Sequence, residues 1–437
     1  MKRFLPAVLL AAACGGPSPI DLRDYEAPDH RFQEPPVRSA AEAILRKEEL
    51  TLEDALKIAD LLNPTLESER RSVDLATAAI WEASLHPNPT LGVQIEEYRT
   101  SGGSFGDSKR VAGVTIPIAL AGRIGKATSA AEQDRVVGAL TYVWRRREIL
   151  NGVKRAFVRV LATRRAEGLA RETRDIARSL HVLTDDRFQA QAVPEMQVLK
   201  TAVNLATAES DLKRAESAAA ISVKALLALL GDIDFPKDRF AGDLALRFTV
   251  PSLEALRGQV LALHPLGEAA RAAREAADLH VAAAEAAWPA DIEITVAAGK
   301  DGGNDTIFEG GIAVPLPLFN RNQGVIRAAE IRRRQAELHV QSVRNDLLLS
   351  LEETWRTFTT AQERARVYRE EILPKAQKAL DLTDEGYKLG KFGYLDVLDA
   401  QRTLAESRTA YTAALEDLNL SAADLEKLTG TRLQAIQ

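Results

Sequence analysis

The chain contains 437 residues, and its 57 lysines and arginines against 62 aspartates and glutamates give a formal net charge of −5. Nucleic-acid-binding surfaces are basic, so this mild acidity argues against a nucleic-acid partner. The six histidines are scattered, with no pair three or four residues apart, and the only cysteine is Cys14. We therefore predict no metal site and no intramolecular disulfide. The sequence also lacks a glycine-rich phosphate loop and a nucleophile elbow, so neither enzyme activity nor a cofactor is predicted.

The first residues have the order of a secretory signal peptide. Lys2 and Arg3 precede an apolar run that ends at Leu10, and three alanines follow at residues 11–13. The apolar run is far shorter than the roughly 20 residues of a membrane-spanning helix. Residues 1–13 are therefore predicted to be a signal peptide. Its removal would change the net charge to −5 − 2 = −7.

Cys14 directly follows these small residues, as the lipidated cysteine does in a bacterial lipobox. We interpret it as the site of a covalent lipid anchor, and the alternative is a plain signal peptide with an incidental cysteine. Residues 14–49 begin with a segment rich in proline, glycine and charge. That composition disfavours a packed core, so the segment is predicted to be an extended tether between the lipid and the folded body.

Two pairs of short segments alternate apolar and polar residues. The first pair lies at about residues 89–98 and 109–118, and the second at about 290–299 and 307–316. Alternation with a period of two is typical of strands with one apolar and one polar face. Four strands make a poor core of their own, so we predict a closed barrel to which several copies contribute, with lipid against the apolar faces. The alternative is a small antiparallel sheet packed on the helices of one chain.

Each pair of strands is followed by a long segment with helical periodicity. No proline occurs between Pro117 and Pro194 or between Pro317 and Pro374, and none occurs after Pro374. Helices can therefore run without interruption. A single helix over residues 123–192 would be about 105 Å long, which no compact core can accommodate.

Both long segments are predicted to fold back as antiparallel helical hairpins, over residues 123–230 and 320–430. Backbone breakers mark the turns, at residues 192–195 and 391–394. Apolar residues recur every seven positions after the second turn, which is the spacing of a coiled-coil seam. They are Val397, Leu404, Tyr411, Leu418 and Leu425.

The two halves of the chain contain similar sequences. At Gly113 the chain reads GVTIPIALAGRIGKATSAAE, and at Gly311 it reads GIAVPLPLFNRNQGVIRAAE, an offset of 311 − 113 = 198 residues. This offset is far longer than the roughly 20 to 50 residues of a solenoid unit. We therefore predict an internal two-fold repeat, with related halves at residues 50–247 and 248–437 that belong to one body.

Four segments carry a recognisable pattern. They read LTLEDALKIADLLNPTL from residue 50, HPNPTLGV from residue 86, VPLPLFNRNQG from residue 314 and GYKLGKFGYLDVLDAQRTL from residue 386. Together they resemble the outer-membrane efflux protein family of the TolC type, and the resemblance extends from about Leu50 to Gly430. The PLPLFNRNQG segment is most similar to the branch that serves heavy-metal cation pumps, the CzcC-like members.

This resemblance implies a homotrimer in the bacterial outer membrane. Each copy would give four strands to a twelve-stranded transmembrane β-barrel, and its hairpins would build a coiled-coil tunnel in the periplasm. Such channels conduct passively: an inner-membrane pump of the RND type supplies the substrate through a periplasmic adaptor protein. Heavy-metal cations are the expected substrate, and organic compounds are the alternative. A periplasmic coiled-coil scaffold or adaptor lipoprotein is a rival of a different class, although it does not explain the strands.

The sharpest local pattern is the pair Asp396 and Asp399. Residues three apart on a helix point the same way, and the resemblance places both carboxylates where related channels narrow at the periplasmic end. The alternative is two solvated helix positions. Tyr387 matches a family position that helps to hold the entrance shut. Phe392 stands where TolC has a basic partner, and Lys391 is the substitute we consider.

The two predicted hairpin tips combine exposed apolar side chains with backbone breakers. Their residues are Val193, Pro194, Glu195 and Met196 in the first half and Phe392, Gly393, Tyr394 and Leu395 in the second. A turn needs breakers but gains nothing from apolar groups in water, so we predict that the tips dock the adaptor. The alternative is that these side chains cap their own hairpins.

Overall fold

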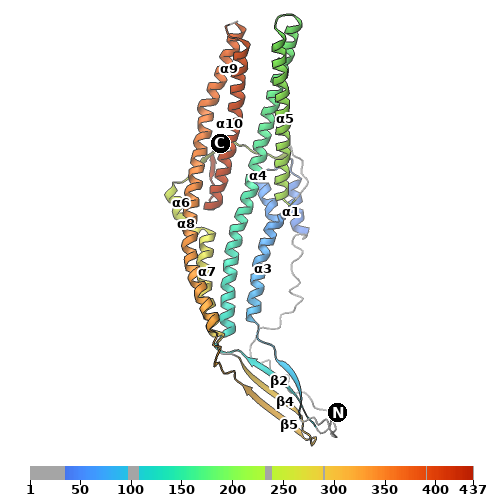
Figure 1. The fold of residues 1–437 in the computed structure, drawn as a ribbon, viewed down its shortest axis with the longest axis vertical. Helices are drawn as coiled ribbons and strands as arrows, with labels where there is room; N and C mark the ends of the chain where they lie inside the picture. The colour runs from blue at the N-terminus through green and yellow to red at the C-terminus, as the bar shows by residue number, and fades with distance from the viewer. Residues whose placement is uncertain (1–34, 97–107, 232–238, 289–290, 390, 437) are drawn as a thin grey trace.

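The computed structural model describes residues 35–96, 108–231, 239–288, 291–389 and 391–436. The molecule is elongated, with long helices at one end and a sheet at the other (Figure 1). The prediction of a mostly helical chain with a small antiparallel sheet is confirmed. The predicted signal peptide, Cys14 and the first part of the tether lie outside the described residues.

The helices form two sets that follow one another along the chain. The first set is α1 (Pro35–Leu45), α2 (Leu52–Leu62), α3 (Pro64–Ser84), α4 (Arg123–Gln189) and α5 (Glu195–Leu229). The second set is α6 (Leu253–Leu263), α7 (Pro265–Ala286), α8 (Gln323–Val367), the π-helix η4 (Tyr368–Ile372), α9 (Leu373–Lys388) and α10 (Tyr394–Thr429). One hairpin consists of α4 and α5, and the other of α8, η4 and α9 against α10.

The π-helical turn η4 lies directly before Pro374. Proline has no N–H to donate and its ring crowds the preceding turn. The chain accommodates it by widening for one turn, in which the N–H of Leu373 donates to the carbonyl of Tyr368, five residues earlier. The second long helix therefore passes Pro374 without ending.

The prediction of an extended tether is wrong over α1. Residues 35–45 read PPVRSAAEAIL and form a helix in which Ala41 is buried. Prolines are tolerated in the first turn, and the alanine-rich remainder favours a helix. Contact with α2 then stabilises it, so the folded body begins before residue 50.

Two pairs of helices stack end to end on either side of α4. At the first junction, between α5 and α3, the Asn63 side chain accepts from the N–H of Leu66 at 2.9 Å and donates to the carbonyl of Leu229 at 2.7 Å. At the second junction, between α10 and α7, the Nδ1 of His264 accepts from the N–H of Leu266 at 3.2 Å. The contacts of α4 and α8 give the order α5 and α3, then α4, then α10 and α7, then α8.

The helical body has its own core. Phe157 and Phe358 are almost fully buried in two apolar clusters that join α4 to α2 and α5, and α8 to α10. All five residues of the predicted heptad are buried. The helical part therefore has an apolar core formed by one chain.

The main sheet contains β1 (Thr90–Glu96), β2 (Lys109–Ile118), β4 (Ile292–Lys300) and β5 (Thr306–Ala313), all antiparallel in the order β1-β2-β4-β5. Strand β5 ends three residues before the predicted boundary at residue 316. Pro315 and Pro317 explain this, because proline cannot donate to a strand ladder. A second sheet, which the sequence did not predict, pairs β3 (Arg247–Thr249) with β6 (Gln434–Ile436).

Candidate functional site

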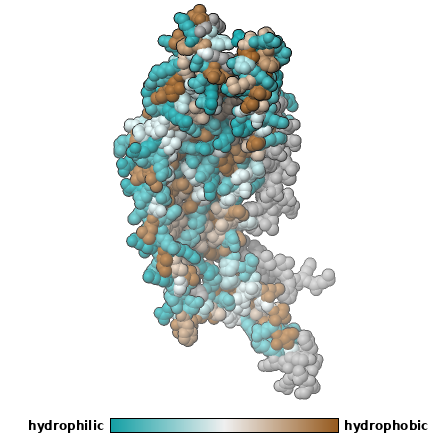
Figure 2. Space-filling model, turned by 45° about the horizontal axis from the view of Figure 1, so that its top comes forward, coloured by the Kyte–Doolittle hydropathy of each residue, from teal (hydrophilic) through white to brown (hydrophobic). Residues whose placement is uncertain are grey.

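The main sheet exposes its apolar face. Most of the large apolar side chains on this face are between 40 and 82% exposed; they are Leu91, Val93, Ile95, Val114, Ile116, Ile118, Val296, Phe308 and Ile312. Ile292 and Ile294 on the same face are half-buried. Hydrophobic atoms are visible over this end of the molecule in Figure 2. No helix of the described ranges packs across the sheet. The alternative of a sheet packed on its own helices is therefore not what these residues form.

The opposite face of the sheet is polar and concave. Along β2 after Arg110 and along β4 from Thr295 onward, its residues are less exposed than their neighbours on the apolar face, because the sheet curves around them. The hydroxyls of Thr115 and Thr295 hydrogen bond across the two strands at 2.9 Å. Small residues such as Gly113 and Ala297 fill much of the remainder. The sheet is thus curved with its polar side inward and its apolar side outward.

The structure places Asp396 and Asp399 in the first two turns of α10, both exposed. Asp396 also caps the helix, since its Oδ2 accepts from the N–H of Gly393 at 2.7 Å. This capping contact gives Asp396 a local role within the hairpin. The placement of both carboxylates at a pore constriction stays a prediction.

Tyr387 has a cationic partner that the sequence did not reveal. The Nη1 of Arg187, near the end of α4, donates to the Tyr387 hydroxyl at 2.7 Å and so joins the two hairpins near their tips. One sequence signal pointed to this pair. The internal offset of about 198 residues places residues near 187 and residue 387 at equivalent positions of the two hairpins. The partner comes from α4 instead of Lys391, while the ring of Phe392 lies over Gly386.

Both hairpin tips expose apolar side chains. Met196 is 58%, Leu395 62% and Phe392 49% exposed. Pro194, Glu195 and Gly393 are also exposed, Val193 is half-buried, and the side chain of Tyr394 lies outside what the structure describes. Exposed apolar groups at both tips are compatible with docking, which stays a prediction.

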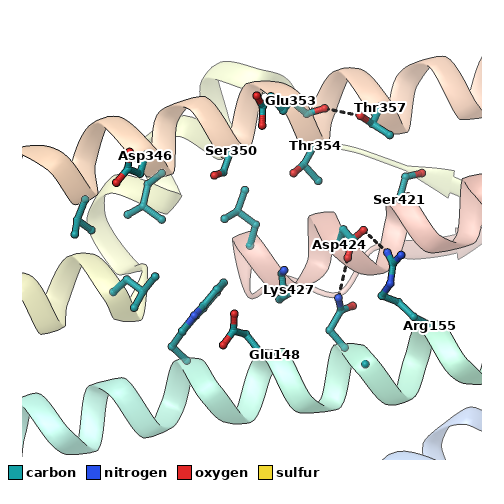
Figure 3. Close-up of a pocket in the computed structure, with 17 residues that line it drawn as sticks. Glu148, Arg155, Asp346, Ser350, Glu353, Thr354, Thr357, Ser421, Asp424 and Lys427 are labelled. Atoms are coloured by element: carbon teal, nitrogen blue, oxygen red, sulfur yellow. Dashed lines mark hydrogen bonds and ion pairs between the residues drawn. The ribbon is translucent and has the colours of Figure 1, made fainter. Parts of the chain in front are cut away.

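A groove of about 790 Å³ lies between α4, α8 and α10 (Figure 3). Two of its charged side chains have partners in the lining: Asp424 accepts from Asn151 and Arg155, and Lys427 lies over the ring of Trp144 at 5.6 Å. Within the described residues no group of three or more histidine, cysteine, aspartate or glutamate side chains could hold a metal ion.

His264, beside this groove, is a buried helix cap. Burial, together with the charges of Arg147 and Lys427, lowers the pKa of its imidazole to about 4. The ring is therefore neutral at physiological pH. Its Nδ1 caps α7, and its ring lies 4.7 Å from that of Trp144.

The profile of the outer membrane efflux protein family matches this chain over residues 55–232 and 256–431. The chain belongs to this family. No helix in the described part of this efflux protein is both long and apolar enough to cross a membrane.

Individual members resemble the efflux protein over much of its length. The cobalt-zinc-cadmium resistance protein CzcC of Cupriavidus metallidurans is 29% identical over 382 residues, 87% of this chain and 90% of CzcC. The pyoverdine export outer membrane protein OpmQ of Pseudomonas aeruginosa is 26% identical over 300 residues, 64% of this chain and 59% of OpmQ. A solved structure of CusC, a protein described as forming a transmembrane channel, superimposes with a TM-score of 0.72 and 17% identity over 86% of this chain and 91% of CusC.

These comparisons confirm the family resemblance found in the sequence, including the likeness to the heavy-metal branch. The family and the structural neighbours are outer-membrane efflux proteins and channels, and are not enzymes. The fold shared with CusC is the long helical body with a short antiparallel sheet.

Proposed function

We propose that this protein is the outer-membrane channel of a tripartite efflux system. It passively conducts a substrate that an inner-membrane RND-type pump delivers through a periplasmic adaptor. The observation that carries this proposal is the exposed apolar face of the main sheet, with its polar face turned inward. Burying such a face against lipid removes apolar surface from water at roughly 25 cal/mol per Å². A membrane is therefore the environment that favours a sheet with its apolar face outward and its polar face inward.

The free edges of the molecule support assembly into a closed ring. In the described sheet the edge strands are β1 and β5, which come from the two halves of the chain. An unpaired edge is satisfied when β5 of one copy pairs with β1 of the next. Three copies would give a twelve-stranded barrel with no edge, which is the form a sheet needs in lipid.

The helical body also has exposed apolar residues on the two sides that would face neighbouring copies. Exposed apolar residues lie on α3 and α5 at one side, including Leu75 and Val203, and on α8 at the other, including Leu338 and Leu349. In a ring these residues would be buried between neighbouring copies as a periplasmic tunnel. The sequence similarity between the two halves, each with two strands and one hairpin, favours such a quasi-symmetric wall.

Heavy-metal cations are the substrate we propose, on the similarity to CzcC over most of both chains. Similarity to the pyoverdine exporter OpmQ keeps an organic substrate as the second candidate. Deletion of the gene distinguishes them. A metal channel predicts sensitivity to cobalt, zinc or cadmium with unchanged sensitivity to organic toxins, and the reverse result would refute the metal assignment.

The ends of the molecule complete the proposal. The tips at residues 193–196 and 392–395 would meet the adaptor. The periplasmic entrance would be lined by Asp396, Asp399 and Tyr387. A lipid on Cys14 would add an anchor in the outer membrane. One test distinguishes the channel from a coiled-coil scaffold. After Cys14→Ser removes the anchor, the channel still requires detergent for extraction, whereas a scaffold becomes soluble.

A further inference from the structure

The concave face of the main sheet carries a charged network that joins its two edges. The Nζ of Lys109 on β2 lies 3.0 Å from a Glu96 carboxylate oxygen on β1 and 2.5 Å from one of Glu309 on β5. These are the edge strands of the sheet, while Lys109 belongs to an inner strand. One ammonium group therefore holds one carboxylate from each edge.

Small residues make this reach possible. Strand β4 separates β2 from β5, and its concave positions at this end are Ala297 and Gly299. Long side chains at these positions would block the path from Lys109 to Glu309. The sheet also has to curve toward its polar side for residues two strands apart to meet.

The network lies at the end of the sheet that is remote from the helices (Figure 1). In the described strands the charged residues on the concave face are Glu96, Lys109, Glu293 and Glu309, which sum to 1 − 3 = −2 for each copy. The charged residues on the convex face are the cations Arg110 and Lys300. The sign of the charge therefore differs between the two faces.

We infer that Lys109, Glu96 and Glu309 form a selectivity ring near the outer mouth of the pore. This inference rests on the proposed function, because the concave face lines a pore only when three copies close a barrel. The ring then holds six carboxylates and three ammonium groups, and this excess of carboxylates favours cations over anions. Lys109 offsets half of the negative charge, which limits how long a cation is retained.

The test is the reversal potential of the purified full-length protein in planar bilayers with a potassium chloride gradient. Lys109→Gln is expected to raise the potassium-to-chloride permeability ratio about two- to threefold. Glu96→Gln with Glu309→Gln changes the charge twice as much in the opposite sense and is expected to lower the ratio by a larger factor. Arg110→Gln is the matched control, since it removes one charge from the convex face beside Lys109. It is expected to leave the ratio unchanged.

The outcomes separate this inference from the function on which it rests. A parent protein that inserts but does not conduct would refute the channel and the ring together. A conducting parent whose ratio is the same in the lysine and glutamate variants would refute the ring alone. Should Lys109→Gln fail to insert, the triple variant that neutralises all three side chains leaves no unpaired charge and changes the charge of the site from −1 to 0 in each copy, so it must show reduced cation preference.

Discussion

The helical body and the main sheet of this efflux protein differ in how far their large apolar side chains are buried. In the body, Phe157 and Phe358 are at most 1% exposed, and each lies within a cluster formed by one chain. In the sheet, Val93 is 73% and Phe308 82% exposed on a face that no described helix covers. The body therefore has a core within one chain, whereas the apolar face of the sheet has no cover from the described part of its own chain.

The largest expected effect comes from placing a charge on the apolar face. Val93→Arg should abolish insertion into the outer membrane, because an arginine near the bilayer midplane costs about 2 to 4 kcal/mol in each copy. Gln94→Arg is the control, since the next residue of β1 belongs to the concave face. The measurement is the amount of protein in the outer-membrane fraction. Normal insertion of Val93→Arg would mean that this face does not meet lipid.

The next effect compares two phenylalanines. Phe358→Ala should destabilise the helical body by about 3 to 5 kcal/mol, because it leaves a cavity in a closed core. Phe308→Ala, on the exposed face of β5, should leave the unfolding of the helices unchanged. Denaturant unfolding of the detergent-solubilised protein, followed by its helical circular dichroism, checks both. Equal losses of stability would contradict the division into two regions.

A third effect uses pH to probe the junction between α10 and α7. The pKa of His264 is lowered to about 4 in the folded protein, so the unfolded chain takes up the proton first as pH falls from 6.5. The stability of the body should therefore be constant above pH 6.5 and decrease by about 3 kcal/mol between pH 6.5 and 4. His264→Asn places at this junction the residue type that caps the first junction, Asn63. This variant should lack the loss of stability between pH 6.5 and 4. An unchanged pH profile in that variant would show that another group is responsible.

The smallest effect concerns the contact between the hairpins. Tyr387→Phe removes the hydroxyl that accepts from Arg187, a loss of about 1 kcal/mol, and should moderately increase the open probability in bilayer recordings. Arg178→Gln is the matched control, because Arg178 pairs with Glu209 inside the first hairpin and does not join the two. If the two variants conduct alike, the Arg187 contact does not hold the entrance.

Much of this arrangement is predictable from sequence because it is set by local repeats. Alternation finds the four long strands, the heptad that begins at Val397 finds a buried seam, and Pro194 and Gly393 mark the two turns. Each of these signals depends on the spacing of residues within one element. The faces of these elements therefore follow from periodicity, and the turns follow from the breakers Pro194 and Gly393.

The remainder depends on contacts between distant segments. The bond from Arg187 to Tyr387 and the pairing of β3 with β6 join residues about 200 positions apart, so no local pattern records them. The network around Lys109 depends on the curvature of the sheet. The helix α1 was missed because two prolines and charged neighbours outweighed the alanines that follow.

The mass of the detergent-extracted particle, determined by native mass spectrometry, tests most directly whether copies join at their sheet edges. Edge pairing of β1 with β5 predicts a particle of three chains, and no stable particle of one chain. A monomer that remains folded with its sheet intact, and that needs no neighbour to cover either edge, would contradict the account.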